Sequence, residues 1–211
     1  MINILKTTLL VGVVTLLITG CFDDKSKAKV VETKAQTTTT KAIKKPTTIN
    51  LAKEASDVFN NTFKDPAKIA PNGKGIILVF GANSDPYTMK LKEDIFDNKK
   101  FQDRFKNDFS SYYLKTSDNL KHKLFHEGEF MDVDTKTMIN IYGITGTPTI
   151  IFTDVKGKAV ILVPGYMPTK QFLVTMDFMD SKKWEGKDRK NGEVYQALKD
   201  YYIANGIQVS K

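Results

Sequence analysis

The stretch "IILVFGANSDPYTMKLKEDIF", residues 76–96, contains the pattern that decides the fold. It opens with an uninterrupted apolar run, which is typical of a strand buried on both faces of a sheet. Asp85 and Pro86 then form a favoured helix opening. An Asp side chain at the N-cap accepts hydrogen bonds from amides two or three residues on, and proline fits the first helical position. We therefore expect a buried strand, a turn and a helix that begins near Pro86.

The rest of the chain alternates between helical and extended patterns. Asn50 is a plausible N-cap for a first helix, and Asp134 is placed to cap a short helix that Gly143 ends. The segment 118–134 is charged and irregular. The expected helices are 50–63, 86–109, 135–143, one from 169 onward and 192–206, and the expected strands are 76–80, 110–117, 149–152 and 159–163, the last two antiparallel.

The N-terminus has the pattern of an export signal. A short segment with one positive charge, at Lys6, precedes an apolar run that is too short for a comfortable membrane span. Its last four residues, "ITGC" (18–21), resemble a bacterial lipobox, in which the cysteine is acylated. The alternative is an ordinary signal peptide with an incidental cysteine. The resemblance implies a lipoprotein signal peptide at 1–20 and a lipidated Cys21 that anchors the protein in the bacterial cell envelope, facing the periplasm, with the membrane leaflet undetermined.

The segment that follows Cys21 is rich in Lys and Thr and almost free of large apolar residues. Such a composition does not bury enough surface to offset the cost of ordering, so residues 21–49 are expected to be a flexible tether. Residues 50–211 then form one domain, with a core at about 70–182 and a C-terminal helical extension at 183–211. The net charge of +8 indicates a lysine-rich solvated surface, and we expect no nucleic-acid partner for an exported chain.

Cys21 is the only cysteine in the sequence, so an intramolecular disulfide is excluded by arithmetic. His122 and His126 are four residues apart, which is the spacing of two metal ligands on one helix face. No third ligand is evident, and Lys121 and Lys123 would repel a cation. We therefore expect exposed histidines in a loop or short helix, with no metal site and no cofactor, and a solvated edge at the nearby acidic residues Glu127, Glu129, Asp132 and Asp134.

Three segments together resemble the thioredoxin-like superfamily: "IILVFGANSDPYTMKLKEDIF" (76–96), "YGITGTPTIIF" (142–152) and "VKGKAVILVPGYMPTKQFL" (155–173). The similarity extends over about residues 70–182 and is closest to secreted thioredoxin-related (SoxW-type) lipoproteins. It implies an α/β, three-layer fold in which a mixed central sheet is flanked by helices, with an added N-terminal helix and an extra C-terminal helix. It also implies that Pro148 is the cis-proline of the family.

The resemblance places the two redox cysteines of the family at Asp85 and Thr88, which flank Pro86 and Tyr87. The first of these cysteines is the nucleophile and the second resolves the mixed disulfide. Neither a carboxylate nor a threonine hydroxyl can cycle between dithiol and disulfide, so we expect no catalytic residues and no thiol–disulfide oxidoreductase activity. Asp85 is instead expected to be a helix cap, stabilised by the positive end of the helix dipole.

One property of the family needs no sulfur. Its members hold extended peptides against the backbone of the residue before the cis-proline, which here is Thr147. Asp85, Tyr87, Thr147 and Pro148 are therefore the candidate peptide-binding groove, although Pro148 can also be present simply because the fold is built around that turn.

These observations leave three classes of function. The first is a lipid-anchored, redox-inactive thioredoxin-fold protein that binds an envelope protein or peptide. The second is an enzyme, either a family member that supports thiol–disulfide or sulfur metabolism through the cysteines of a partner, or a hydrolase that uses Asp85. The third is an envelope lipoprotein in which the domain is a spacer.

Overall fold

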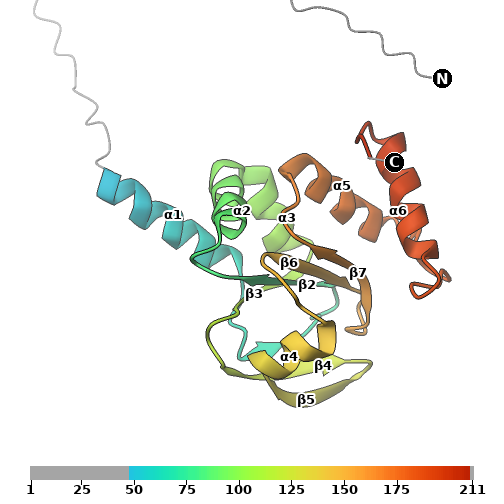
Figure 1. Ribbon diagram of the computed structural model, residues 1–211, viewed down its shortest axis with the longest axis horizontal. Coiled ribbons are helices and arrows are strands. Elements are labelled where there is room, and N and C mark those ends of the chain that lie inside the picture. Colours follow the sequence, from blue (N-terminus) through green and yellow to red (C-terminus); the bar gives the residue numbers. More distant parts are fainter. Residues whose placement is uncertain (1–47, 210–211) are drawn as a thin grey trace, which may run out of the picture. The chain divides into compact units, whose positions relative to one another are not determined.

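The computed structural model describes residues 48–209, which belong to one compact unit, Lys45–Lys211 (Figure 1). The helices are α1 (Thr48–Thr62), α2 (Pro86–Asp97), α3 (Lys99–Asn107), α4 (Thr135–Tyr142), α5 (Thr169–Asp180) and α6 (Glu193–Ala204). The strands are β1 (Lys68–Ile69), β2 (Ile76–Gly81), β3 (Ser110–Lys115), β4 (Lys121–His126), β5 (Glu129–Asp134), β6 (Thr149–Thr153) and β7 (Ala159–Pro164). Cys21 and the predicted tether up to residue 47 lie outside the described residues, whereas residues 48–49 of that prediction belong to α1.

The strands form two sheets. The main sheet has the order β3-β2-β6-β7, in which β2 and β3 are parallel and the other neighbours are antiparallel. A smaller sheet has the order β1-β4-β5. The predicted fold class is confirmed: a mixed sheet is flanked by helices, with one helix, α1, at the start of the domain and another, α6, at its end.

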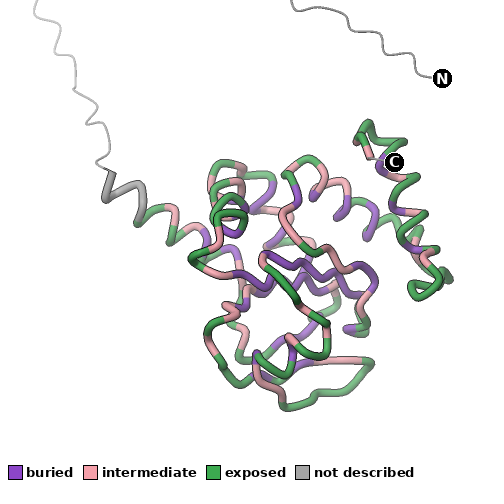
Figure 2. Tube along the Cα trace, viewed as in Figure 1, coloured by how far each residue is buried: buried purple, intermediate pink, exposed green. Residues whose placement is uncertain are grey.

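The main sheet separates two hydrophobic cores, because the side chains of β2 alternate between its faces. Ile77 and Val79 pack into the core under α1, α2, α3, α5 and α6, whereas Leu78 and Phe80 pack toward α4 and the small sheet. Every residue of β2 is buried, as the uninterrupted apolar run predicted. Figure 2 shows the buried strands of the main sheet between the more exposed outer layers.

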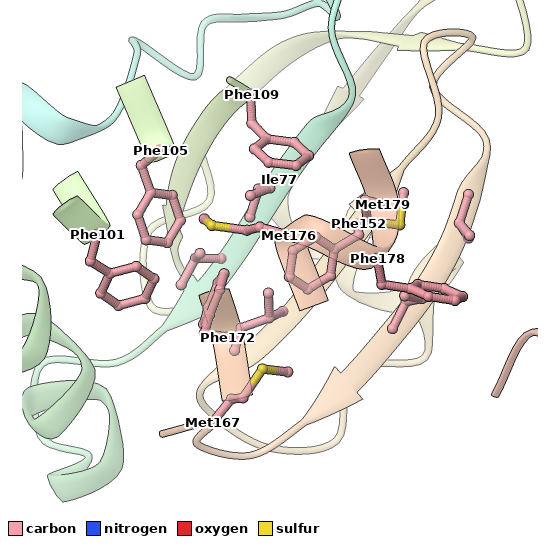
Figure 3. Close-up of a cluster of buried hydrophobic side chains, with 14 of the residues drawn as sticks. Ile77, Phe101, Phe105, Phe109, Phe152, Met167, Phe172, Met176, Phe178 and Met179 are labelled. Carbon is pink, nitrogen blue, oxygen red and sulfur yellow. The ribbon is translucent and has the colours of Figure 1, made fainter. Parts of the chain in front are cut away.

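Aromatic side chains form the centre of the larger core. Phe172 of α5 lies with its ring centroid 4.9 Å from that of Phe101, 5.1 Å from that of Phe105 and 5.4 Å from that of Phe152 (Figure 3). Ring pairs at this separation add stabilisation beyond the apolar area that they bury. The cluster therefore fixes α3 and α5 on the same face of the main sheet.

The helix expected over 86–109 is in fact two helices, and this part of the prediction was wrong. Asn98 ends α2 in an extended conformation and caps α3, because its Oδ1 accepts a hydrogen bond from the amide of Phe101 at 3.0 Å. The side-chain amide of Gln102 donates to the carbonyl oxygens of Ile95 and Phe96, at 2.8 and 3.0 Å. These bonds satisfy carbonyls that the end of α2 leaves without helical partners.

The segment expected to be irregular, 118–134, is a β-hairpin, and this expectation was also wrong. Glu127 and Gly128 both have positive φ, at 49° and 98°, in a two-residue connection between His126 and Glu129. Positive φ at both central residues is the geometry of the tight type I′ hairpin turn, which matches the twist of the strands.

The helices at the two ends of the domain differ from the prediction in one boundary and add one packing contact. α1 begins at Thr48, so Asn50 lies in its first turn and is not its cap. At the other end, α6 packs Val194, Leu198 and Tyr202 into the larger core, and the hydroxyl groups of Tyr202 and Thr175 are 2.6 Å apart. The C-terminal helix is therefore part of the domain core. Within residues 48–209, no helix is both long and apolar enough to cross a membrane.

Candidate functional site

The candidate site is the turn between β2 and α2. Asp85 is the N-cap of α2, with Pro86 at the first helical position, as the sequence predicted. Its carboxylate accepts hydrogen bonds from the amides of Tyr87, at 3.3 Å, and Thr88, at 2.9 Å. These two amides belong to the first turn of the helix, which has no carbonyl partners of its own, so the cap stabilises the start of α2.

The buried hydroxyl group of Thr88 links two residues of the turn, Asp85 and Ala82, by hydrogen bonds. It donates a hydrogen bond to Oδ2 of Asp85 at 2.6 Å and accepts one from the amide of Ala82 at 3.3 Å. Thr88 is 1% exposed, so its side chain is not open to a ligand. A Cβ atom on the neighbouring Gly81 would lie 2.6 Å from the hydroxyl oxygen of Tyr113 and 2.8 Å from Cγ2 of Thr88, which explains why glycine stands there.

Thr147 and Pro148 lie against this turn. The peptide bond between them is cis, as the resemblance implied, and it leads into β6. Pro148 is buried, and its carbonyl oxygen accepts a hydrogen bond from the amide of Gly165 at 2.7 Å. The side chain of Thr147 lies close enough to Asp85 to lower the pKa of its carboxyl group, so the two loops of the candidate groove are neighbours.

Asp85 is a carboxylate in this setting. Partial burial acts to raise its pKa, but hydrogen bonds from the Thr88 hydroxyl, from the amides of Thr88 and Tyr87 and from Thr147 lower the pKa below its usual value of 3.8. The group is therefore charged at neutral pH and acts as a hydrogen-bond acceptor. It is poorly suited to be a general acid, which must hold a proton near the working pH.

The structure brings together three of the four groove residues as an accessible surface. Tyr87 is 60% exposed, and Asp85 and Thr147 are partly exposed, whereas Pro148 forms the buried floor. Neither the amide nor the carbonyl of Thr147 forms a hydrogen bond with another part of the chain between residues 48 and 209. A strand-like segment could therefore pair with this backbone without displacing an internal bond.

His122 and His126 are separate from this surface. Both lie on β4, and the strand belongs to the layer on the opposite side of the main sheet from α2 (Figure 1). Nδ1 of His122 is 2.8 Å from the carbonyl oxygen of Pro66 and its Nε2 is 2.9 Å from the hydroxyl oxygen of Thr135. His122 is 3% exposed, so the expectation of an exposed loop histidine was wrong. Among the described residues, no group of three or more His, Cys, Asp or Glu side chains is arranged to hold a metal ion.

Tyr113 is a feature of the site that the sequence reasoning missed. Its hydroxyl group is buried beside Gly81 and Thr88 and has no hydrogen-bond partner among the described residues. Burial, with Asp118 and Asp85 as further causes, raises its pKa to about 12. The alternating pattern of 110–117 predicted a strand. It could not predict that Gly81 lies close to the ring of Tyr113, because that contact depends on the pairing of β2 with β3.

Comparison with known proteins supports the fold described above. Residues 62–180 match the family described as "Thioredoxin-like domain". A thioredoxin-fold protein from Helicobacter pylori is 31% identical, with a TM-score of 0.65 over 73% of this chain and 98% of that chain. No match was found among curated proteins.

Two more distant structures are also similar. A thioredoxin from Thermus thermophilus is 14% identical, with a TM-score of 0.41 over 56% of this chain and 90% of that chain. The pneumococcal exposed lipoprotein thioredoxin from Streptococcus pneumoniae is 21% identical, with a TM-score of 0.37 over 50% of this chain and 85% of that chain.

The match to the family over 62–180 and the Helicobacter pylori structure together settle the family. This chain belongs to the thioredoxin-like domain family.

Proposed function

We propose that this protein is a lipid-anchored thioredoxin-fold lipoprotein of the SoxW-related kind, and that it binds an extended segment of a partner protein or peptide in the cell envelope. The segment lies along Thr147 and Pro148 and beside Asp85 and Tyr87. The protein contributes no thiol of its own to this contact, since its one cysteine, Cys21, is the proposed lipid attachment site.

The observation that carries the proposal is the free backbone of Thr147. Its amide and carbonyl make no internal hydrogen bond within the described chain, and they lie on the surface that holds Asp85 and the exposed ring of Tyr87. A peptide that adds to such a backbone gains main-chain hydrogen bonds, while neighbouring side chains give specificity. The charged Asp85 and the aromatic Tyr87 favour a segment with a hydrogen-bond donor or cation next to an apolar side chain.

A partner cysteine could also reach this surface. In that case the thiol chemistry would be that of the partner, and this protein would position the segment. The two possibilities share the same contact with Thr147, so binding is the property to test first.

Site-specific photo-crosslinking in intact cells tests the proposal. A photoreactive phenylalanine analogue at position 87 is expected to form a discrete crosslinked product with an envelope protein. The same analogue at Ile203 of α6 is the control, because its side chain is 57% exposed and thus about as accessible as that of Tyr87, at 60%. Equal crosslinking patterns from both positions would contradict a specific groove.

The anchor is tested separately. Cys21→Ser is expected to abolish labelling by a radioactive fatty acid and to move the protein from the detergent phase to the aqueous phase. Unchanged detergent-phase partitioning of this variant would contradict the lipoprotein assignment without bearing on the groove.

A further inference from the structure

A pocket with a volume of about 660 Å³ lies between α1 and α2 and above the end of β3. Small-molecule sites in proteins range from about 300 to 1,000 Å³, so the volume is sufficient for a ligand. None of the four groove residues, Asp85, Tyr87, Thr147 and Pro148, lines this pocket. It is therefore a separate feature from the surface described above.

The wall of the pocket is largely apolar. Phe59, Met89, Phe96, Leu120 and the ring of Tyr113 line it. Met89 and Leu120 are 43% and 56% exposed, so they present apolar surface to solvent at the pocket. An apolar chain placed here would bury these side chains and gain stability from each CH₂ group removed from water.

The ammonium group of Lys92 lies among the aromatic side chains that line the pocket. The ammonium group of Lys92 lies 4.8 Å from the ring centroid of Phe59 and 5.1 Å from that of Tyr113, and it donates a hydrogen bond to Oδ1 of Asn83 at 3.0 Å. An ammonium group has three donors, so two remain for other partners. None of the ion pairs formed within residues 48–209 includes Lys92, whereas Lys115, which also lines the pocket, is paired with Asp118.

The charges around Lys92 favour one kind of occupant. Burial, and then repulsion from Lys115, lower the pKa of Lys92, so a nearby anion would stabilise its charged form. Glu93 and Asp97 are exposed residues of α2 that also line the pocket, and their carboxylates disfavour an anion near them, so a negative head group is favoured only beside Lys92. The site therefore suits a single negative charge attached to an apolar body.

We propose that this pocket binds a small amphiphile with one carboxylate head and an apolar chain, such as a medium-chain fatty acid. The carboxylate accepts hydrogen bonds from Lys92, and the chain lies against Phe59 and Phe96. The geometry that carries the proposal is a half-buried ammonium group in an apolar pocket, with no carboxylate partner among residues 48–209.

Dodecanoate is a suitable probe, measured by isothermal titration calorimetry below its micelle concentration. The chain from residue 21 onward with Cys21→Ser is the protein to use, because it contains the whole compact unit Lys45–Lys211 and carries no lipid. We expect saturable binding of dodecanoate at one site. Octanoate should bind more weakly because its chain buries less apolar surface, and dodecanol and dodecyltrimethylammonium should bind at least about tenfold more weakly because neither supplies an anion to Lys92.

Two pairs of variants locate the site. Lys92→Met is expected to weaken dodecanoate binding about tenfold or more and to leave dodecanol binding unchanged. Lys100→Met, at an exposed lysine of α3 that does not line the pocket, is the control and should bind as the parent does. Leu120→Lys should strengthen dodecanoate binding and Leu120→Glu should weaken it, because residue 120 lies at the same pocket and is exposed enough to accept either charge.

The proposal is overturned if dodecanoate shows no saturable binding, if the three head groups bind alike, or if Lys92→Met and Lys100→Met have the same effect. Should Lys92→Met fail to fold, opposite effects of the two Leu120 variants still support the site and equal effects still overturn it. Photo-crosslinking from position 87 does not depend on this pocket, so failure here and failure of the proposed function are distinguishable.

Discussion

The hydroxyl group of Thr88 donates a hydrogen bond to Oδ2 of Asp85 at 2.6 Å, at the two positions where the thioredoxin resemblance places a redox pair of cysteines. The same carboxylate also caps α2 through the amides of Tyr87 and Thr88. We propose, from that resemblance, that this hydrogen-bonded cap occupies the place of a thiol pair.

Asp85→Ala is expected to lower the free energy of unfolding by about 1 to 2 kcal/mol, because the first turn of α2 loses its cap and the buried Thr88 hydroxyl loses its acceptor. Asp97→Ala is the matched control on the same helix, since Asp97 is exposed and should change stability by less than about 0.5 kcal/mol. Urea unfolding of both variants provides the comparison. Equal losses would show that Asp85 is not a specific cap.

The charge of Asp85 predicts a dependence of stability on pH. Its pKa is lower in the folded protein than the usual value of 3.8, so its carboxylate stabilises the folded state above that pH, and this contribution is lost as the pH falls through the folded pKa. Asp85→Asn keeps a capping side chain but removes the charge. The parent should be more stable than Asp85→Asn at neutral pH, and the difference should shrink below pH 3.8. A difference that is constant over this range would contradict the pKa direction.

Two adjacent tyrosines of β3 should respond differently to the loss of a hydroxyl group. The hydroxyl of Tyr112 donates to the carbonyl of Ala70 at 2.9 Å and accepts from its amide at 3.0 Å, whereas the buried hydroxyl of Tyr113 has no partner among the described residues. Tyr112→Phe should cost about 1 to 3 kcal/mol, and Tyr113→Phe should be neutral or stabilising. Thermal unfolding of the two variants tests this, and a larger cost for Tyr113→Phe would be the contrary outcome.

The proposal that Asp85 and Thr88 hold the positions of the family's redox cysteines predicts that a redox-active pair can be introduced there. In a Cys21→Ser background, Asp85→Cys with Thr88→Cys should close a disulfide on mild oxidation, because these residues already contact each other at the helix N-terminus. Asp85→Cys with Tyr87→Cys is the control and should stay reduced, since the side chain of Tyr87 points to solvent and is 60% exposed. The unmodified protein should show no turnover in an insulin reduction assay. Closure of the control pair alone would place the redox positions elsewhere.

Much of the fold was predictable because its signals are local. Asp85 with Pro86, and Asp134 with Gly143, mark helix ends through hydrogen bonds within a few residues, and both predictions are confirmed. The burial of β2 was predicted equally directly, because a strand with apolar residues on both faces must be covered on both faces.

Most of the features that were missed depend on contacts between residues far apart in the sequence, and one had a local signal that was not used. The alternation of β4 was hidden because its buried face carries His122, whose ring is satisfied by Pro66 and Thr135. The pair Glu127-Gly128 was an available hairpin signal. The free backbone of Thr147 and the cation of Lys92 among aromatic rings could not be predicted, because each results from the packing of segments far apart in the sequence.

The most direct test of the account is the effect of Thr147→Arg on photo-crosslinking from position 87. An arginine side chain at Thr147 would cover the backbone that we propose to pair with the partner segment. Thr137→Arg, at an exposed threonine of α4, is the matched control. The account predicts that the crosslinked product is lost with Thr147→Arg and kept with Thr137→Arg, at equal protein levels. An undiminished product with Thr147→Arg would contradict binding at this groove.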